Sequence, residues 1–181
     1  ALDTACHTAS CAVSENGVIL AESSIHGMKT HSQKLMPLVA ALLHLLDLQA
    51  SDIDAFAVSS GPGSFTGLRI GVVTAKSLAY GAGRPVFGIP TLEALAFTVP
   101  CWEGTVCSVL DARNQQAYCG FYKREDAAIK RLRQDEAMHV DQLANALLSF
   151  DSNVLLVGDC AEHFAELLRR SFTETQTSSK V

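Results

Sequence analysis

The chain has 181 residues, of which 48% are hydrophobic and 18% charged, and its formal net charge is −5. Ordinary soluble domains carry about 25% charged residues, so this chain is under-charged, and its mean hydropathy is positive at +0.19. This composition excludes intrinsic disorder, and the acidic balance argues against a free-standing nucleic-acid binder. An under-charged soluble chain is a candidate for burying surface against a partner.

The sequence gives no sign of export or membrane insertion. It begins at Ala1 without a basic segment, so we expect no secretory signal. Leu2 reads as the end of a strand whose start is absent, so we expect a fragment. The longest apolar stretch, 35–46, is shorter than the roughly 20 residues of a transmembrane helix. None of the six cysteines forms a C-x-x-C pair, which favours reduced, packed thiols and a cytoplasmic location.

The first half of the chain predicts strands alternating with helices. An Asn-Gly pair at 16–17 favours a tight hairpin between the first two strands. The elements expected here are strands over 9–13 and 18–25, a helix over 32–48, a strand over 54–59 and a helix over 68–82.

Both predicted helices carry more apolar or small surface than one core requires. The first helix has one leucine stripe and, beside it, a second apolar stripe that includes Leu46. In the second helix small residues recur at every fourth position, and small side chains let another backbone approach closely. We therefore predict that the two helices form a partner surface. Its residues are Leu35, Leu38, Leu42, Leu46, Gly67, Gly71, Ala75 and Ala79.

A short strand over 85–89 and a helix over 91–97 complete the first half, and the same kind of pattern restarts after Pro100. The elements expected beyond it are strands over 105–110, 116–122 and 127–133, a helix over 140–148, a strand over 154–157 and a last helix from 159. Strands followed by strand–helix alternation predict an α/β fold. The restart predicts two subdomains, 1–100 and 101–181. The charged segment 123–136 is more typical of a solvated hairpin than of an RNA-binding patch.

The most distinctive local feature is the glycine-rich loop between the predicted strand and helix, from Gly61 to Gly67. Backbone amides in such a strand–loop–helix could hold an anion. The loop lacks the Gly-Lys-Ser/Thr of a Walker A motif, and its third glycine lies one position late for G-x-G-x-x-G. A purely structural turn and a phosphate or partner contact both remain open.

Other polar residues lie at predicted strand ends, where site residues gather. Each of these positions also has a simple alternative as a turn residue. The candidates for contacts to a partner or a nucleotide are Asp3, Thr4, Gly61, Gly63, Ser64, Thr66, Arg69, Asp111 and Arg113. The six histidines show no H-x-x-x-H or H-E-x-x-H spacing, so the sequence predicts no metal site.

These motifs together resemble a known family. The stretch Ser-Gly-Pro-Gly-Ser-Phe-Thr-Gly-Leu-Arg-Ile-Gly at 60–71 is similar to the signature of the TsaB family, also called YeaZ. Asp3-Thr4, His31-Ser32, the segment 88–93 and the Asp-Ala-Arg at 111–113 resemble further landmarks of that family. The resemblance covers about residues 1–122.

The resemblance implies an ASKHA (actin/Hsp70-like) fold, with two duplicated α/β subdomains and an incomplete C-terminal end. It implies an accessory role in making threonylcarbamoyladenosine (t6A) at position 37 of tRNA. The expected partners are the catalytic relative TsaD, as a heterodimer, and the ATPase TsaE. We expect a homodimer when the protein is isolated, only indirect contact with tRNA, and no membrane association.

A comparison with TsaD-like proteins predicts a subunit that is not catalytic alone. Two metal-binding histidines of those proteins correspond to Thr91 and Leu95 here, and neither replaces an imidazole ligand. We expect no cofactor of its own, with ATP and metal held by the partner subunits. The alternatives are an ASKHA-type enzyme, peptidase-like or an ATP-binding phosphotransferase, that uses Asp3, Ser64, Thr66 and Asp111, and an unrelated interaction module on the same fold.

Overall fold

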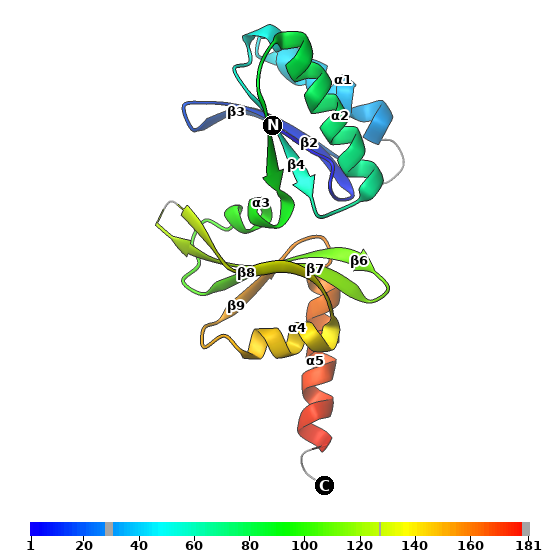
Figure 1. Cartoon of the computed structure of the whole chain (residues 1–181), viewed down its shortest axis with the longest axis vertical. Coiled ribbons are helices and arrows are strands. Elements are labelled where there is room, and N and C mark those ends of the chain that lie inside the picture. Colours follow the sequence, from blue (N-terminus) through cyan, green and yellow to red (C-terminus); the bar gives the residue numbers. More distant parts are fainter. Residues whose placement is uncertain (28–30, 127, 179–181) are drawn as a thin grey trace. The chain divides into compact units, whose positions relative to one another are not determined.

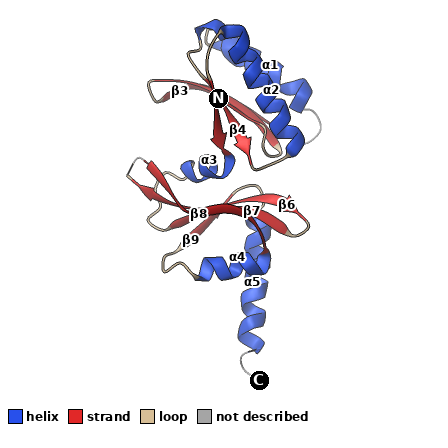
Figure 2. Cartoon of the chain, in the orientation of Figure 1, coloured by secondary structure: helices blue, strands red, loops and turns tan. Residues whose placement is uncertain are grey.

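The computed structural model describes residues 1–27, 31–126 and 128–178, with side chains through residue 170. The chain separates into two compact units, Ala1–Thr91 and Leu92–Val181. Both units are α/β, with helices packed on a sheet (Figures 1 and 2).

The first unit is built on a five-stranded sheet in the order β3-β2-β1-β4-β5. The strands β1, β2 and β3 are antiparallel neighbours, whereas β4 is parallel to β1 and β5 is parallel to β4. The strands are β1 Leu2–Asp3, β2 Thr8–Glu15, β3 Val18–His26, β4 Phe56–Gly61 and β5 Val86–Pro90. The Asn-Gly hairpin prediction is confirmed, because Asn16 and Gly17 both have positive φ.

Two helices, α1 (His31–Leu45) and α2 (Phe65–Ala82), pack against this sheet and contact each other (Figure 1). Leu35 of α1 and Ala75 of α2 share one apolar cluster with Leu2 and Val58 of the sheet. A short 3₁₀ turn, η1 (Ala50–Asp52), which the sequence did not predict, precedes β4.

The ends of α1 and α2 differ from the predicted ones for local reasons. Ser64 caps α2 by accepting a hydrogen bond from the Gly67 amide, so α2 begins at Phe65 and not at residue 68. Gly83 closes α2 in the left-handed conformation with φ of 64°. α1 ends at Leu45, before residue 48, and Asp47 just beyond it has φ of 52°.

The second unit repeats the order of the first four strands of the first unit. Its sheet runs β8-β7-β6-β9, with antiparallel β6, β7 and β8 and with β9 parallel to β6. The elements are β6 Thr105–Arg113, β7 Gln116–Glu125, β8 Ala128–His139, α4 Val140–Leu148, β9 Val154–Val157 and α5 Ala161–Ser178. Three antiparallel strands, a helix and a parallel strand therefore occur twice, which confirms the predicted duplication. The strand predicted over 127–133 matches β8, except that residue 127 lies outside the described residues.

The helix α3 (Thr91–Phe97) lies at the boundary between the units. Its later residues are held by the second unit: Glu93 pairs with Arg131 at 3.3 Å, and the Arg124 guanidinium lies 5.4 Å from the Phe97 ring centroid. These contacts explain why the division falls after Thr91, earlier than the 100/101 boundary that the sequence suggested.

Candidate functional site

The predicted loop residues of the first unit gather at one edge of its sheet. β1 ends at Asp3, β4 at Gly61 and β5 at Pro90, and these three strands are parallel. The carboxyl ends of parallel strands are the usual place for ligands in open α/β sheets. The structure thus brings the candidates from residues 3–4 and 61–64 together at the ends of neighbouring strands.

Hydrogen bonds tie the glycine-rich loop to the segment after β1. The Ser64 amide donates to the Ala5 carbonyl at 2.7 Å, and the Thr4 hydroxyl donates to the Gly67 carbonyl at 2.7 Å. The Gly61 amide donates to the Thr91 hydroxyl at 3.2 Å. The backbone amides of Gly61, Ser64 and Gly67 therefore already donate hydrogen bonds within the chain, so they are not available to bind an anion.

Close approach of two backbones explains the glycines. A Cβ at Gly67 would lie 2.0 Å from the Thr4 carbonyl oxygen, and one at Gly63 would lie 2.6 Å from the Ala5 carbonyl oxygen. A Cβ at Gly71 would lie 2.4 Å from the Thr4 hydroxyl oxygen. Gly63 also has φ of 154°, which L side chains rarely adopt. The geometry accounts for the motif as packing, and an anion contact there stays a prediction.

Asp3 and His31 stabilise the turn that follows β1. The Asp3 carboxylate accepts from the Ala5 amide at 2.9 Å, which is the local turn that an Asp favours. His31 Nε2 lies 3.1 Å from the Cys6 carbonyl oxygen, so this ring nitrogen is the donor. Within the described ranges, no group of three or more His, Cys, Asp or Glu side chains is placed to hold a metal ion.

The remaining loop candidates lie elsewhere. Thr66 and Arg69 are exposed on α2, and the Arg69 guanidinium lies 5.4 Å from the Phe65 ring centroid. Asp111 and Arg113 are exposed in the β6–β7 hairpin of the second unit, where the Asp111 carboxylate accepts from the Arg113 amide at 2.8 Å. Arg113 has φ of 69°, an uncommon conformation for a residue with a Cβ.

The structure corrects the choice of partner-contact residues on the two helices. The small-residue line of α2 faces its own sheet, and Ala75 and Ala79 are fully or almost fully buried. The predicted α1 leucines also lie in the core of the same unit, except Leu46, which is half-buried. The residues buried inside the chain are Leu35, Leu38, Leu42, Gly67, Gly71, Ala75 and Ala79. Their side chains are therefore unavailable to a partner.

The outer face of α2 carries apolar side chains that sequence reasoning missed. Phe65, Val73 and Tyr80 are 74%, 61% and 91% exposed. At 3.6 residues per turn their positions fall within about 80° of one another, on the side opposite the small-residue line. On α1, Met36 and Leu45 are also exposed. This periodicity was readable from the sequence, but Phe65 lay outside the predicted helix.

Burial raises the pKa of three cysteines of the second unit, Cys107, Cys119 and Cys160. Cys107 and Cys119 are fully buried in its core. Desolvation, followed by the charge of Glu136, raises the pKa of Cys119 to about 12. Desolvation and the nearby Asp159 likewise raise the pKa of Cys160 to about 12. A thiol that stays protonated is a poor nucleophile and metal ligand. The prediction of packed thiols is confirmed for the buried Cys11, Cys107 and Cys119, whereas Cys101 is exposed.

Several basic side chains of β8 form ion pairs with acidic side chains. Lys130 pairs with Glu125 at 3.2 Å, and Arg131 pairs with Glu93 and, at 3.6 Å, with Asp135. Paired cations leave little net positive charge for phosphates. This agrees with the interpretation of 123–136 as a solvated hairpin.

The duplicated sheet order is that of the ASKHA class, and the comparisons with known proteins agree. The chain matches the family model of TsaD, tRNA N6-adenosine threonylcarbamoyltransferase, over residues 18–178. Its fold is similar to that of YeaZ from Pseudomonas aeruginosa, with a TM-score of 0.80, 26% identity and coverage of 91% of this chain and 76% of the other. A second structure, described as similar to peptidase YeaZ from the same organism, has a TM-score of 0.75 at 23% identity, covering 96% and 90% of the two chains.

Sequence relatives define the family more closely. The chain is 32% identical to the tRNA threonylcarbamoyladenosine biosynthesis protein TsaB of Bacillus subtilis, over 87% of this chain and 69% of that protein. It is 34% identical to TsaB of Escherichia coli, over 76% of this chain and 60% of that protein. The chain belongs to the TsaB (YeaZ) family.

Proposed function

We propose that this chain acts in tRNA threonylcarbamoyladenosine biosynthesis as a scaffold subunit that binds TsaD. Family membership supports the pathway, since the Bacillus subtilis and Escherichia coli relatives are named for it. The exposed apolar face of α2 supports the scaffold role and is the observation on which it rests. The chain covers 69% and 60% of these two relatives, so the activity of the whole protein is part of the proposal.

The docking face that we propose is the outer surface of α2 and the adjoining α1. Phe65, Val73 and Tyr80 place apolar area in solvent along a helix whose opposite side is already packed. Exposed aromatic and aliphatic side chains on one face are typical of protein–protein contact sites. A helical partner from TsaD would bury them, and a second copy of this chain would do so when TsaD is absent.

The residues at the metal-binding positions of TsaD-like proteins support a non-catalytic role. Thr91 is buried, and its hydroxyl accepts the Gly61 amide, so it serves the packing of the first unit. Leu95 is half-buried and has no ligand atom. The proposal therefore assigns the transfer chemistry, ATP and metal to TsaD and TsaE.

We assign the tRNA contact to the partner subunits because the net charge is −5 and the β8 cations are ion-paired. No described helix is long and apolar enough to cross a membrane. A cytoplasmic location is part of the proposal, because that is where tRNA is modified.

Val73→Glu tests the docking face. The substitution places a carboxylate in the centre of the exposed stripe, where burial against TsaD would leave the charge unpaired. We expect an affinity loss of about 2 kcal/mol or more, roughly a 30-fold rise in the Kd for TsaD in titration calorimetry. Because Val73 is exposed, the fold of the free protein should be unchanged by circular dichroism.

Phe87→Glu is the matched control. Phe87 is also exposed and apolar, but it lies on β5, outside the two helices. The Phe87→Glu variant should bind TsaD with the same affinity as the parent protein. Equal affinity for the parent, Val73→Glu and Phe87→Glu would refute the docking face. Normal t6A in the tRNA of cells depleted of the protein would refute the pathway.

A further inference from the structure

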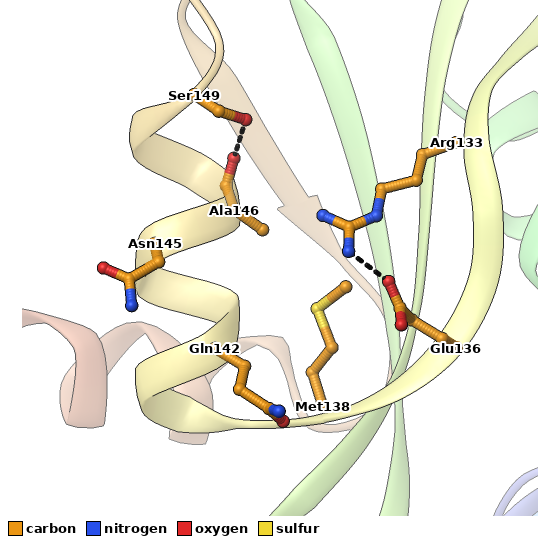
Figure 3. A pocket seen from close by; sticks show the side chains of 7 residues that line it. All are labelled: Arg133, Glu136, Met138, Gln142, Asn145, Ala146 and Ser149. Carbon is orange, nitrogen blue, oxygen red and sulfur yellow. Dashed lines mark hydrogen bonds and ion pairs between the residues drawn. The ribbon is translucent and has the colours of Figure 1, made fainter.

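The second unit has a groove that the proposed function does not use. It lies between the strand β8 and the helix α4, with a volume of about 380 Å³ (Figure 3). Figure 3 shows Arg133 and Glu136 on the strand side and Gln142 and Asn145 on the helix side. Met138 and the helix residues Ala146 and Ser149 complete the lining.

The strand wall of this groove is also a free sheet edge. In the described part of the chain, β8 pairs with β7 on one side and with no strand on the other. Glu136 pairs with Cys119 in register and Met138 with Ala117, so both side chains point to the face that α4 covers. An unpaired strand edge offers backbone donors and acceptors to another strand. A groove bounded by an edge strand and a helix suits an extended peptide better than a compact ligand.

The strand wall carries one positive and one negative side chain, which are paired with each other. Arg133 and Glu136 form an ion pair, and each side chain is 46% exposed. An exposed pair of this kind contributes only about 0–1 kcal/mol, so it can exchange partners at little cost. Below the charges, the buried Met138 and Ala146 give an apolar floor.

We infer that this groove binds an extended peptide, which pairs as an antiparallel strand with β8. Side chains of an added strand that share a face are two residues apart. The charges on β8 then select a peptide with an apolar residue beside Met138, a basic residue beside Glu136 and an acidic residue beside Arg133. Arg133 and Glu136 are three residues apart in β8, but a register shift places them opposite Phe121 and Cys119 of β7, which are two apart. A peptide that keeps this two-residue spacing in the antiparallel direction reads apolar-x-basic-x-acidic from the amino end.

A fluorescein-labelled peptide, Thr-Leu-Thr-Lys-Thr-Glu-Thr with blocked ends, is the probe for the whole chain in fluorescence anisotropy. We expect saturable binding, weakened about fivefold or more when Lys and Glu are exchanged in the probe. Two further probes carry N-methyl groups on one or the other alternate set of amides. Only the set that faces β8 should abolish binding, because it removes the strand hydrogen bonds.

Asn145→Trp should fill the groove and remove binding, while Leu148→Trp, an exposed position of α4 outside the lining, should leave it unchanged. Circular dichroism checks that both variants fold. No anisotropy change with the original probe overturns the inference. It is equally overturned by equal affinity for the charge-exchanged probe, or by binding that survives both N-methylation patterns.

Discussion

Substituting Gly67→Ala should damage the fold of the first unit, although alanine favours helices. The added Cβ would lie 2.0 Å from the Thr4 carbonyl oxygen. Real Cβ contacts stay above 3.0 Å, so α2 and the segment after β1 must separate by about 1 Å. Overpacking of this kind costs about 1–3 kcal/mol. The movement also weakens the 2.7 Å hydrogen bond from the Thr4 hydroxyl to the Gly67 carbonyl, worth about 1 kcal/mol.

Alanine offsets about 1 kcal/mol of this cost through its helix propensity, so we expect a net loss of about 1–3 kcal/mol in the free energy of unfolding. Urea denaturation followed by circular dichroism measures it. Gly81→Ala is the matched control, because Gly81 lies in the same helix with no atom within 4 Å of an added Cβ. The control should gain about 0.5–1 kcal/mol. A Gly67→Ala loss below about 1 kcal/mol, or an equal loss in the control, would refute the close-approach argument.

Three further predictions concern pH, charge and nucleotide. Since the folded pKa of Cys119 is about 12 against an ordinary 9.0, its stabilising contribution is complete below pH 9 and is lost between about pH 9 and 12. Cys119→Ala should flatten the fall of urea stability over that range, and an unchanged slope contradicts the assignment. Arg131→Ala removes the contacts to Glu93 and Asp135 and should cost about 1 kcal/mol. This cost should shrink in 1 M NaCl, and a salt-independent loss would indicate packing instead. ATP with Mg²⁺ should give no submicromolar binding in calorimetry, and such binding would favour the enzyme alternative.

The elements were largely predictable because their signals are local. The Asn16-Gly17 turn, the 3.6-residue periodicity of α1 and the apolar β9 depend on residues close in the chain. The start of α2 was not predicted, since the glycine-rich segment resembled a loop up to Gly67. Only the Ser64 cap, whose hydroxyl accepts the Gly67 amide, shows that the helix already includes Phe65.

The candidate site was predictable in position but not in detail. Strand order placed residues 3–4 beside residues 61–64, as motifs at strand ends suggest. Sequence periodicity could not show which side of α2 meets the sheet, because small residues permit close packing against either a partner or a neighbouring strand. The atoms that decide this are the Thr4 carbonyl and hydroxyl, which lie in the chain 63 residues from Gly67.

This assignment changes what the glycine-rich motif says about function. Gly63, Gly67 and Gly71 each face the backbone or hydroxyl of residues 4–5. The glycines of this motif are therefore required by the packing of α2 and its preceding loop against the segment that follows β1. A motif with that role identifies a fold and a family, and it does not identify a ligand. Because the small residues occupy the inner side, the bulky Phe65, Val73 and Tyr80 are left on the outer side. The partner contact that we propose for this helix therefore uses that outer face, which is where the Val73→Glu experiment acts.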